Sequence, residues 1–362
     1  MKAFFLKHKK LYIWLLADLG LLAAFFLSRS NRVWMNALAE RVTTPLKQAI
    51  GRLCYLTPVS VMEVLCVLLV LFGVAYVVWS VVAVCRKKEK RGRRAWSAVL
   101  GAVCISLSLY AGFCLMWGVN FWTDSFQDKS GIVAEPVAPE DLLKVTVHFA
   151  QQLIETADDV PRDENGVFAV SWQEILEKSP YIYDPLEREM PFLAFDDPGV
   201  KPMMFSELMS IINYTGFYCA CTGESNVNVN APACLLPATV AHELAHQRGI
   251  ASEQECNFLA VLASTTSGDP VYAYSGWLDG FIYVGNALYR LNPEIYWAIR
   301  DALPETVKAD LEYNTAYWDQ YRDTVAEKVA DTVYDQALKA YGDERGVQSY
   351  GTVVDMLVAY YK

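Results

Sequence analysis

Histidine is scarce in this chain of 362 residues, which contains only four: His8, His148, His242 and His246. This scarcity excludes a site built from many histidines. Two of the four fall within the single stretch His242-Glu243-Leu244-Ala245-His246. A functional site built on that stretch must therefore include carboxylate side chains as well as the two histidines.

Acidic residues are also rare, but only in the first third of the chain. Residues 1–118 contain 16 Lys and Arg against 4 Asp and Glu, whereas the remaining residues contain 15 against 37, a net charge of −22. A strongly acidic domain disfavours nucleic acid and anionic lipid head groups as partners. We therefore expect no nucleic-acid partner.

Three long apolar runs occupy the acid-poor part. Leu11 to Leu27 is interrupted only by Asp18, Val59 to Cys85 only by Glu63, and Ala95 to Trp117 contains no charged residue. At about 1.5 Å per residue, each run can cross about 30 Å of hydrocarbon. We predict that residues 1–118 form a membrane domain in the lipid bilayer, with three transmembrane helices at about 11–27, 59–85 and 95–117. The two carboxylates are either functional or interfacial.

Positive charge predicts the orientation. Four lysines precede the first run, and seven Lys and Arg lie between Arg86 and Arg94, against five in the longer loop from Ser28 to Pro58. Cytoplasmic loops carry an excess of positive charge. The N-terminus is thus predicted to be cytoplasmic, and three spans then place residues 119–362 outside the cytoplasm.

The outer segment, residues 119–362, has the size and composition of one globular domain. Apolar residues recur at helical spacing over most of it, and the alternating stretch Asn226 to Asn230 predicts a short edge strand. We expect a mainly α-helical α+β domain. The expected helices are 139–157, 172–178, 206–212, 237–247, 253–264, one ending near 290, 312–340 and 353–361, with a loop at 180–203.

The His242 to His246 stretch has the HExxH spacing of a catalytic zinc site. Residues four apart lie on one face of a helix, so both imidazoles can reach one metal ion, while Glu243 lies beside the open coordination position. We predict Zn²⁺ as the cofactor, His242 and His246 as ligands, and Glu243 as the general base.

A third ligand is required, and the remaining histidines are poor choices because His8 lies before the first span and His148 lies in an amphipathic helix. Glu253 and Glu255 follow closely, at the start of the next helix. We prefer Glu253, because Glu255 can instead form a capping box with Ser252 and is only an alternative ligand. The spacing of Glu253 to Asn257 resembles the ExxxD of gluzincin peptidases, which implies that Asn257 orients a metal-binding histidine.

The asparagines of the predicted strand are candidate substrate contacts. An edge strand can bind an extended peptide through its backbone, and Asn226, Asn228 and Asn230 lie on one face of it. The alternative is an ordinary edge, because polar side chains also protect strand edges from association.

Two sets of residues remain open. Cys219, Cys221 and Cys234 could be disulfide partners, a second metal site or unpaired residues. An oxyanion stabiliser is also needed, and the sequence offers as candidates Tyr272, Tyr274 and Arg248. With 21 tyrosines in the chain, a place in the core is the favoured alternative for each of the two tyrosines.

The chain resembles a bacterial family of uncharacterised three-span membrane proteins. The resemblance covers nearly the whole length, and the TGExNxN and HELAHQxG pair is its most specific part. It implies a zincin-like outer domain with a gluzincin-like metal site. The matching segments are Met116 to Phe121, Thr222 to Asn228, His242 to Gly249, Glu253 to Phe258 and Gly346 to Gly351.

Two functions are consistent with these features. The first is a membrane-anchored zinc metallopeptidase that cleaves a peptide or protein substrate outside the cytoplasm. The second is a non-catalytic membrane sensor or scaffold with a structural or degenerate zinc site, for which Asp18, Glu63 and the basic loop from Arg86 to Arg94 would be the main support. The sequence gives neither the substrate nor the oligomeric state.

Overall fold

A computed structural model describes residues 8–86, 90–196, 198–322 and 350–362, together with residues 324, 328, 329, 332 and 336. Its contacts divide the chain into two units. Unit 1 contains Met1–Ile50, Val61–Thr123 and Ala220–Thr222; unit 2 contains Gly51–Ser60, Asp124–Cys219 and Gly223–Lys362. The segment Gly51–Ser60, between the first two apolar runs, therefore belongs to unit 2, although the predicted boundary at residue 118 assigned it to the membrane domain.

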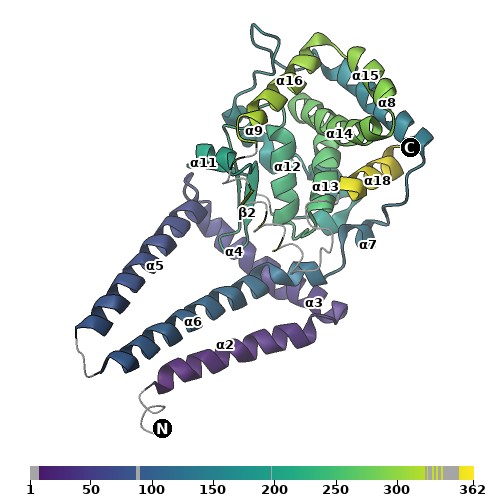
Figure 1. Cartoon of the computed structure of the whole chain (residues 1–362). Helices are drawn as coiled ribbons and strands as arrows, with labels where there is room; N and C mark the ends of the chain where they lie inside the picture. The colour runs from purple at the N-terminus through teal and green to yellow at the C-terminus, as the bar shows by residue number, and fades with distance from the viewer. Residues whose placement is uncertain are drawn as a thin grey trace. The chain divides into compact units, whose positions relative to one another are not determined.

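Unit 1 contains three helices that are long and apolar enough to cross a membrane: α2 (Lys9–Ser28), α5 (Val61–Cys85) and α6 (Arg91–Met116) (Figure 1). All three predicted spans are thus helical, and the helices are candidate membrane spans by length and composition. The stretch between α2 and α5 is helical rather than a loop. It forms α3 (Arg32–Leu38), the π-helix η1 (Ala39–Thr43) and α4 (Thr44–Cys54), and η3 (Gly118–Trp122) follows α6.

Asp18 lies in the middle of α2 and is buried within unit 1. The Ser108 hydroxyl on α6 donates to its carboxylate, at 3.1 Å from Oδ1 and 3.0 Å from Oδ2. Trp14 Nε1 donates to the same hydroxyl at 2.7 Å. The intramembrane carboxylate thus joins two of the three membrane helices, because a polar group in this setting needs a partner.

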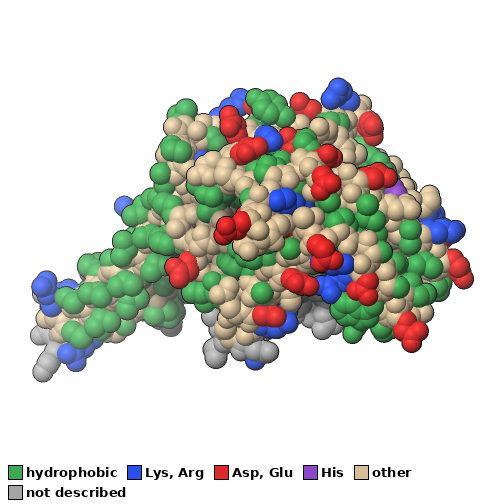
Figure 2. Space-filling view, turned by 90° about the horizontal axis from the view of Figure 1, so that it is seen from above, with side chains coloured by type: hydrophobic (Ala, Val, Ile, Leu, Met, Phe, Trp, Pro, Cys, Tyr) green, Lys and Arg blue, Asp and Glu red, His purple; other side chains and the backbone are tan. Residues whose placement is uncertain are grey.

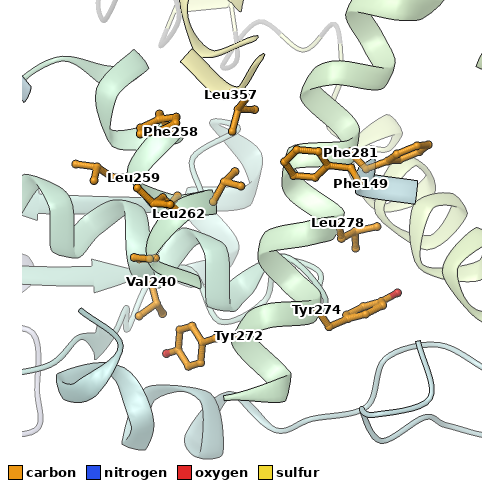
Figure 3. Close-up of a cluster of buried hydrophobic side chains, with 14 of the residues drawn as sticks. Phe149, Val240, Phe258, Leu259, Leu262, Tyr272, Tyr274, Leu278, Phe281 and Leu357 are labelled. Carbon is orange, nitrogen blue, oxygen red and sulfur yellow. The ribbon is translucent and has the colours of Figure 1, made fainter. Parts of the chain in front are cut away.

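Unit 2 is built around helices that share one hydrophobic core (Figure 3). The central helices are α8 (Pro139–Thr156), α12 (Leu236–Gln247), α13 (Glu253–Thr266), α14 (Pro270–Leu291) and α18 (Tyr350–Tyr361). All five match predicted helices, since their apolar residues recur at helical spacing. On the face shown in Figure 2, Asp and Glu side chains are spread widely rather than gathered into one patch.

A three-stranded sheet accompanies these helices, with β1 (Lys201–Pro202), β2 (Gly216–Cys219) and β3 (Glu224–Val227) in the order β1-β3-β2. The predicted edge strand is wrong, because β3 is the central strand, parallel to β1 and antiparallel to β2. Asn226 and Asn228 are fully buried. These polar residues therefore do not form the solvent-exposed face that the alternating pattern indicated.

The other elements are short or peripheral. The predicted loop at 180–203 contains helical turns. The predicted helix 312–340 begins within α16 (Glu305–Asp319), and most of its remainder lies outside the described residues. The remaining elements are α7 (Phe126–Ser130), α9 (Trp172–Lys178), η4 (Ser179–Tyr181), α10 (Asp184–Glu189), η5 (Pro191–Leu193), α11 (Ser206–Ile211), α15 (Pro293–Asp301) and α16 (Glu305–Asp319).

We expect Leu278→Ala to destabilise unit 2, because Leu278 is fully buried on α14 in the core shown in Figure 3. Loss of a buried leucine side chain costs about 2–5 kcal/mol. Leu291→Ala on the same helix is the matched control, since Leu291 is 55% exposed. Thermal unfolding of the detergent-solubilised chain should show a lower Tm for the first variant only, and equal Tm values would contradict this core.

Candidate metal centre

The HExxH stretch forms the second half of α12. His242 Nε2 and His246 Nε2 lie 3.1 Å apart, and the two rings are nearly perpendicular at 80°. Pro237 occupies the first turn of α12, where its missing N–H costs no hydrogen bond. The helical spacing therefore brings both imidazoles to one point, as predicted.

Glu253 completes the cluster from the start of α13. Its Oε2 lies 3.2 Å from His242 Nε2, and its Oε1 lies 3.4 Å from His246 Nε2. Within the described residues, His242, His246 and Glu253 are the group of three whose ligand atoms converge, all within 4.8 Å of one another. These three side chains could hold a metal ion.

A tight turn between α12 and α13 makes this meeting possible. Gly249 has φ +87°, a left-handed conformation that most residues avoid, and it reverses the chain directly after α12. The Ser252 hydroxyl then accepts from Glu255 N at 3.5 Å and caps α13. Glu253 is the first residue of α13, so the turn returns it to the histidines.

The ring of His246 is oriented by the same turn. Its Nδ1 lies 2.8 Å from the carbonyl oxygen of Ile250, which can only accept a hydrogen bond. The ring therefore carries a proton on Nδ1 and turns Nε2 towards Glu253. The predicted orienting role of Asn257 is not seen here, because Ile250 takes it and Cys256 Sγ fills the adjacent space, 3.3 Å from Nδ1.

Glu255 is directed away from the cluster. Its carboxylate accepts from the backbone N–H of Phe126 at 3.0 Å and of Gln127 at 3.2 Å, at the start of α7. It is therefore neither the alternative ligand nor the reciprocal half of a capping box. A carboxylate suits this place because the first amides of a helix have no intrahelical partner.

Glu243 lies beside the cluster and is 4% exposed. Burial raises its pKa to about 7, although the two histidines oppose the shift. Its Oε2 makes no hydrogen bond within the part of the chain that the structure describes. By contrast, His246 and His242 hold the pKa of Glu253 well below its ordinary value despite burial, so this carboxylate is charged.

Two neighbours of the cluster are not evident from the sequence. Gly216 on β2 packs against Glu243 so closely that an added Cβ would lie 2.8 Å from Glu243 Cδ. Asp279 on α14 lies near enough to feel the charge of His242, while burial raises its pKa to about 7. A carboxylate within the largely apolar helix α14 was the available signal for Asp279.

The candidate oxyanion stabilisers are engaged elsewhere. Tyr272 donates to Ile175 O at 2.7 Å, and Tyr274 donates to Asp310, both within the core of Figure 3. Arg248 pairs with Glu187 at 2.6 Å. The two tyrosines thus have the core positions that were the favoured alternative for them, and Arg248 is held in an ion pair, so the oxyanion stabiliser stays open.

The remaining histidines and cysteines lie outside the cluster. His148 packs in an aromatic group, with its ring centroid 5.5 Å from that of Trp277, which agrees with its predicted structural role. Of the three cysteines whose state was open, Cys219 is half-buried, Cys221 is exposed and Cys234 is buried. None of them belongs to the converging group found among the described residues.

Two of the three asparagines of the predicted substrate strand are buried within the structure, whereas Asn230 is exposed. Asn228 Nδ2 donates to Ser210 Oγ at 2.8 Å and to Tyr214 O at 3.1 Å, and its Oδ1 accepts from Asn230 N at 3.0 Å. Asn226 is buried in the central strand. β3 is paired with β2 along its whole length and with β1 at Asn226 and Val227, so an extended peptide could not pair with it at those two residues.

Comparison with known proteins places this cluster in a family context. Residues 39–358 match a family described as "Protein of unknown function (DUF3810)". The chain belongs to this family. No curated protein and no solved structure matches the chain. The matched region contains the whole cluster, and the family description assigns it no activity.

We expect Glu253→Ala and Glu255→Ala to have opposite effects. Loss of Glu253 removes a carboxylate from the cluster and should greatly weaken metal binding with little loss of stability. Loss of Glu255 leaves two α7 amides without their acceptor, at a cost of about 1–3 kcal/mol, and should leave metal binding intact. Metal content and Tm of both purified variants provide the measurement, and the reverse pattern would reassign the ligand.

Proposed function

We propose that the protein is a membrane-anchored zinc peptidase whose catalytic domain lies outside the cytoplasm. The observation that carries this proposal is the convergence of His242, His246 and Glu253, with the buried carboxylate of Glu243 next to them. Two imidazoles and one carboxylate are the ligand set of several catalytic zinc sites, which leave one coordination position open.

The spacing of the three side chains fits zinc. Bonds of about 2.0–2.2 Å in a tetrahedral centre separate neighbouring donor atoms by roughly 3.3–3.6 Å. In the structure the two Nε2 atoms lie 3.1 Å apart, and they lie 3.2 and 3.4 Å from the two oxygens of Glu253, so the three separations are within about 0.2 Å of this range. Bound Zn²⁺ would supply a Lewis acid that activates water and polarises a scissile carbonyl group.

Glu243 has the properties of the general base. It adjoins His242 in the sequence, and its Oε2 has no hydrogen-bond partner among the described residues that would compete for a proton. In the proposed reaction it accepts a proton from the attacking water and passes it to the leaving amine. Burial supports this role because it raises the proton affinity of the carboxylate.

The backbone of β2 is the surface on which a peptide substrate would lie. Among the described residues, β2 pairs only with β3, and its Gly216 passes directly over Glu243. An extended peptide that paired with the other edge of β2 would lie beside the general base. The substrate strand of the proposal is therefore β2 rather than the asparagine-rich β3.

The sensor or scaffold alternative has less support. Asp18 was part of the support for this alternative. Its carboxylate accepts hydrogen bonds from Ser108 and so contributes to packing within unit 1. A structural zinc site, moreover, has four protein ligands, whereas the described residues bring together three.

We expect Glu243→Gln to abolish peptide hydrolysis while leaving zinc content and Tm unchanged. The amide has nearly the same shape but cannot accept the proton. General acid–base catalysis contributes about 10²- to 10⁴-fold to the rate, which sets the size of the loss. The measurement is cleavage of a peptide library by the full-length protein in detergent, with and without a chelator.

His246→Ala is the control for the metal itself. It should lower bound zinc from about one equivalent to near none, because it removes one of three ligands. Wild-type protein without stoichiometric zinc would exclude a zinc enzyme, and a Glu243→Gln variant that cleaves as well as wild type would exclude this reaction.

The extracytoplasmic location can be tested by cysteine labelling of intact cells. A cysteine added after Lys362 should react with an impermeant maleimide, whereas one placed within residues 86–94 should not, since positive loops stay in the cytoplasm. The exposed native Cys66, Cys85 and Cys221 are first replaced by serine. The opposite labelling pattern would place the catalytic unit in the cytoplasm.

A further inference from the structure

The segment between the first two membrane helices is built into unit 2 through Tyr55. The Tyr55 hydroxyl donates to Gly199 O at 2.8 Å and accepts from Ser225 N and from Gln247 Nε2, each at 3.2 Å. One side chain thus joins the loop before β1, the central strand β3 and the active-site helix α12. Ser225 is fully buried, as is Gln247.

Both partners of Tyr55 lead directly to the metal centre. Gln247 follows His246 in the chain and also donates to Gly199 O at 3.3 Å. Ser225 Oγ donates to the carbonyl oxygen of Glu243 at 2.9 Å. On one path, Tyr55 is hydrogen-bonded to the residue that follows the proposed ligand His246. On the other path, two hydrogen bonds through Ser225 connect Tyr55 to the backbone of the proposed general base, Glu243.

A buried ion pair holds the segment around Tyr55 in place. Lys201 Nζ lies 2.6 Å from Glu224 Oε1, with the two side chains 5% and 0% exposed. The same ammonium group donates to Cys54 O at 2.8 Å and to Val59 O at 2.9 Å, and it lies 4.8 Å from the centre of the Tyr55 ring. A buried charge is stabilised only by such a full set of partners, so the segment and the sheet fix each other.

We propose that Gly51–Ser60 is a positioning element of the metal centre, and that Tyr55 is the positioning residue that holds α12 in its ligand-bearing orientation. The segment continues directly into the membrane helix α5 at Val61. A displacement of that helix end would therefore act on α12 through Tyr55. This inference rests on the proposed function only for the identity of the metal.

The test uses full-length protein in detergent and compares Tyr55→Phe with Arg52→Ala. Phenylalanine keeps the ring but removes all three hydrogen bonds. Arg52 belongs to the same segment, and its ion pair with Asp196 is exposed, with side-chain exposures of 69% and 60%, so its loss controls for a change in the segment itself. Amide hydrogen exchange is measured across α12 and α14, and zinc affinity is measured by chelator competition.

Tyr55→Phe should speed exchange in α12 roughly tenfold without a matching change in α14, and should raise the zinc Kd roughly tenfold, as for groups that support metal ligands. Arg52→Ala should change neither. Exchange that rises equally in both helices shows a purely structural residue and overturns the proposal. Unchanged α12 exchange, or an unchanged zinc Kd in a protein that binds zinc, also overturns it.

Two further outcomes are covered by the design: wild-type protein that binds no zinc, and a Tyr55→Phe variant that does not fold. If wild-type protein binds no zinc, the proposed function fails, and exchange in α12 alone decides whether Tyr55 positions the helix. If Tyr55→Phe does not fold, Gln247→Met removes the contacts from the helix side, namely the hydrogen bonds of Gln247 to Tyr55 and to Gly199. It must then speed exchange in α12, and an unchanged rate overturns the proposal.

Discussion

The reversal of the chain between α12 and α13 is the constraint on which the candidate centre depends. Two histidines on one helical turn are a local feature, but the carboxylate must come from another element. The left-handed Gly249 allows the helices to be joined within a few residues, and the Ile250 carbonyl inside the turn fixes the His246 ring. The turn thus both delivers a ligand and orients one.

Local sequence patterns predicted the features that depend on short stretches of chain, namely the long apolar helices, the core helices of unit 2 and the candidate metal ligands. The three membrane helices follow from apolar length, and the five core helices of unit 2 follow from periodicity and end signals. The metal cluster was predictable because HExxH and the Ser252 cap place Glu253 within reach of the histidines. Each of these features spans fewer than about thirty residues of continuous chain.

Features that depend on contacts distant in sequence were predicted poorly. β3 was taken for an edge because its residues alternate, but β1 and β2 bury both of its edges. Tyr272 and Tyr274 are fully buried on α14, which is the core position favoured for them, but their partners Ile175 and Asp310 lie on distant elements that the sequence did not indicate. Glu255 seemed a local cap, yet its partners on α7 lie more than a hundred residues earlier. No local pattern encodes such pairings.

Asp18 and Ser108 have a consequence for how unit 1 assembles. A carboxylate at the middle of an apolar helix contributes a cost of about 2.5–3.5 kcal/mol to entry into the bilayer, which the apolar residues of the same helix must offset. Its hydrogen-bond donor lies on α6, the third membrane helix to leave the ribosome. The Asp18 carboxylate therefore gains this donor only when α6 is present, so the cost of carrying it in α2 is relieved by a contact that the first apolar helix cannot make alone.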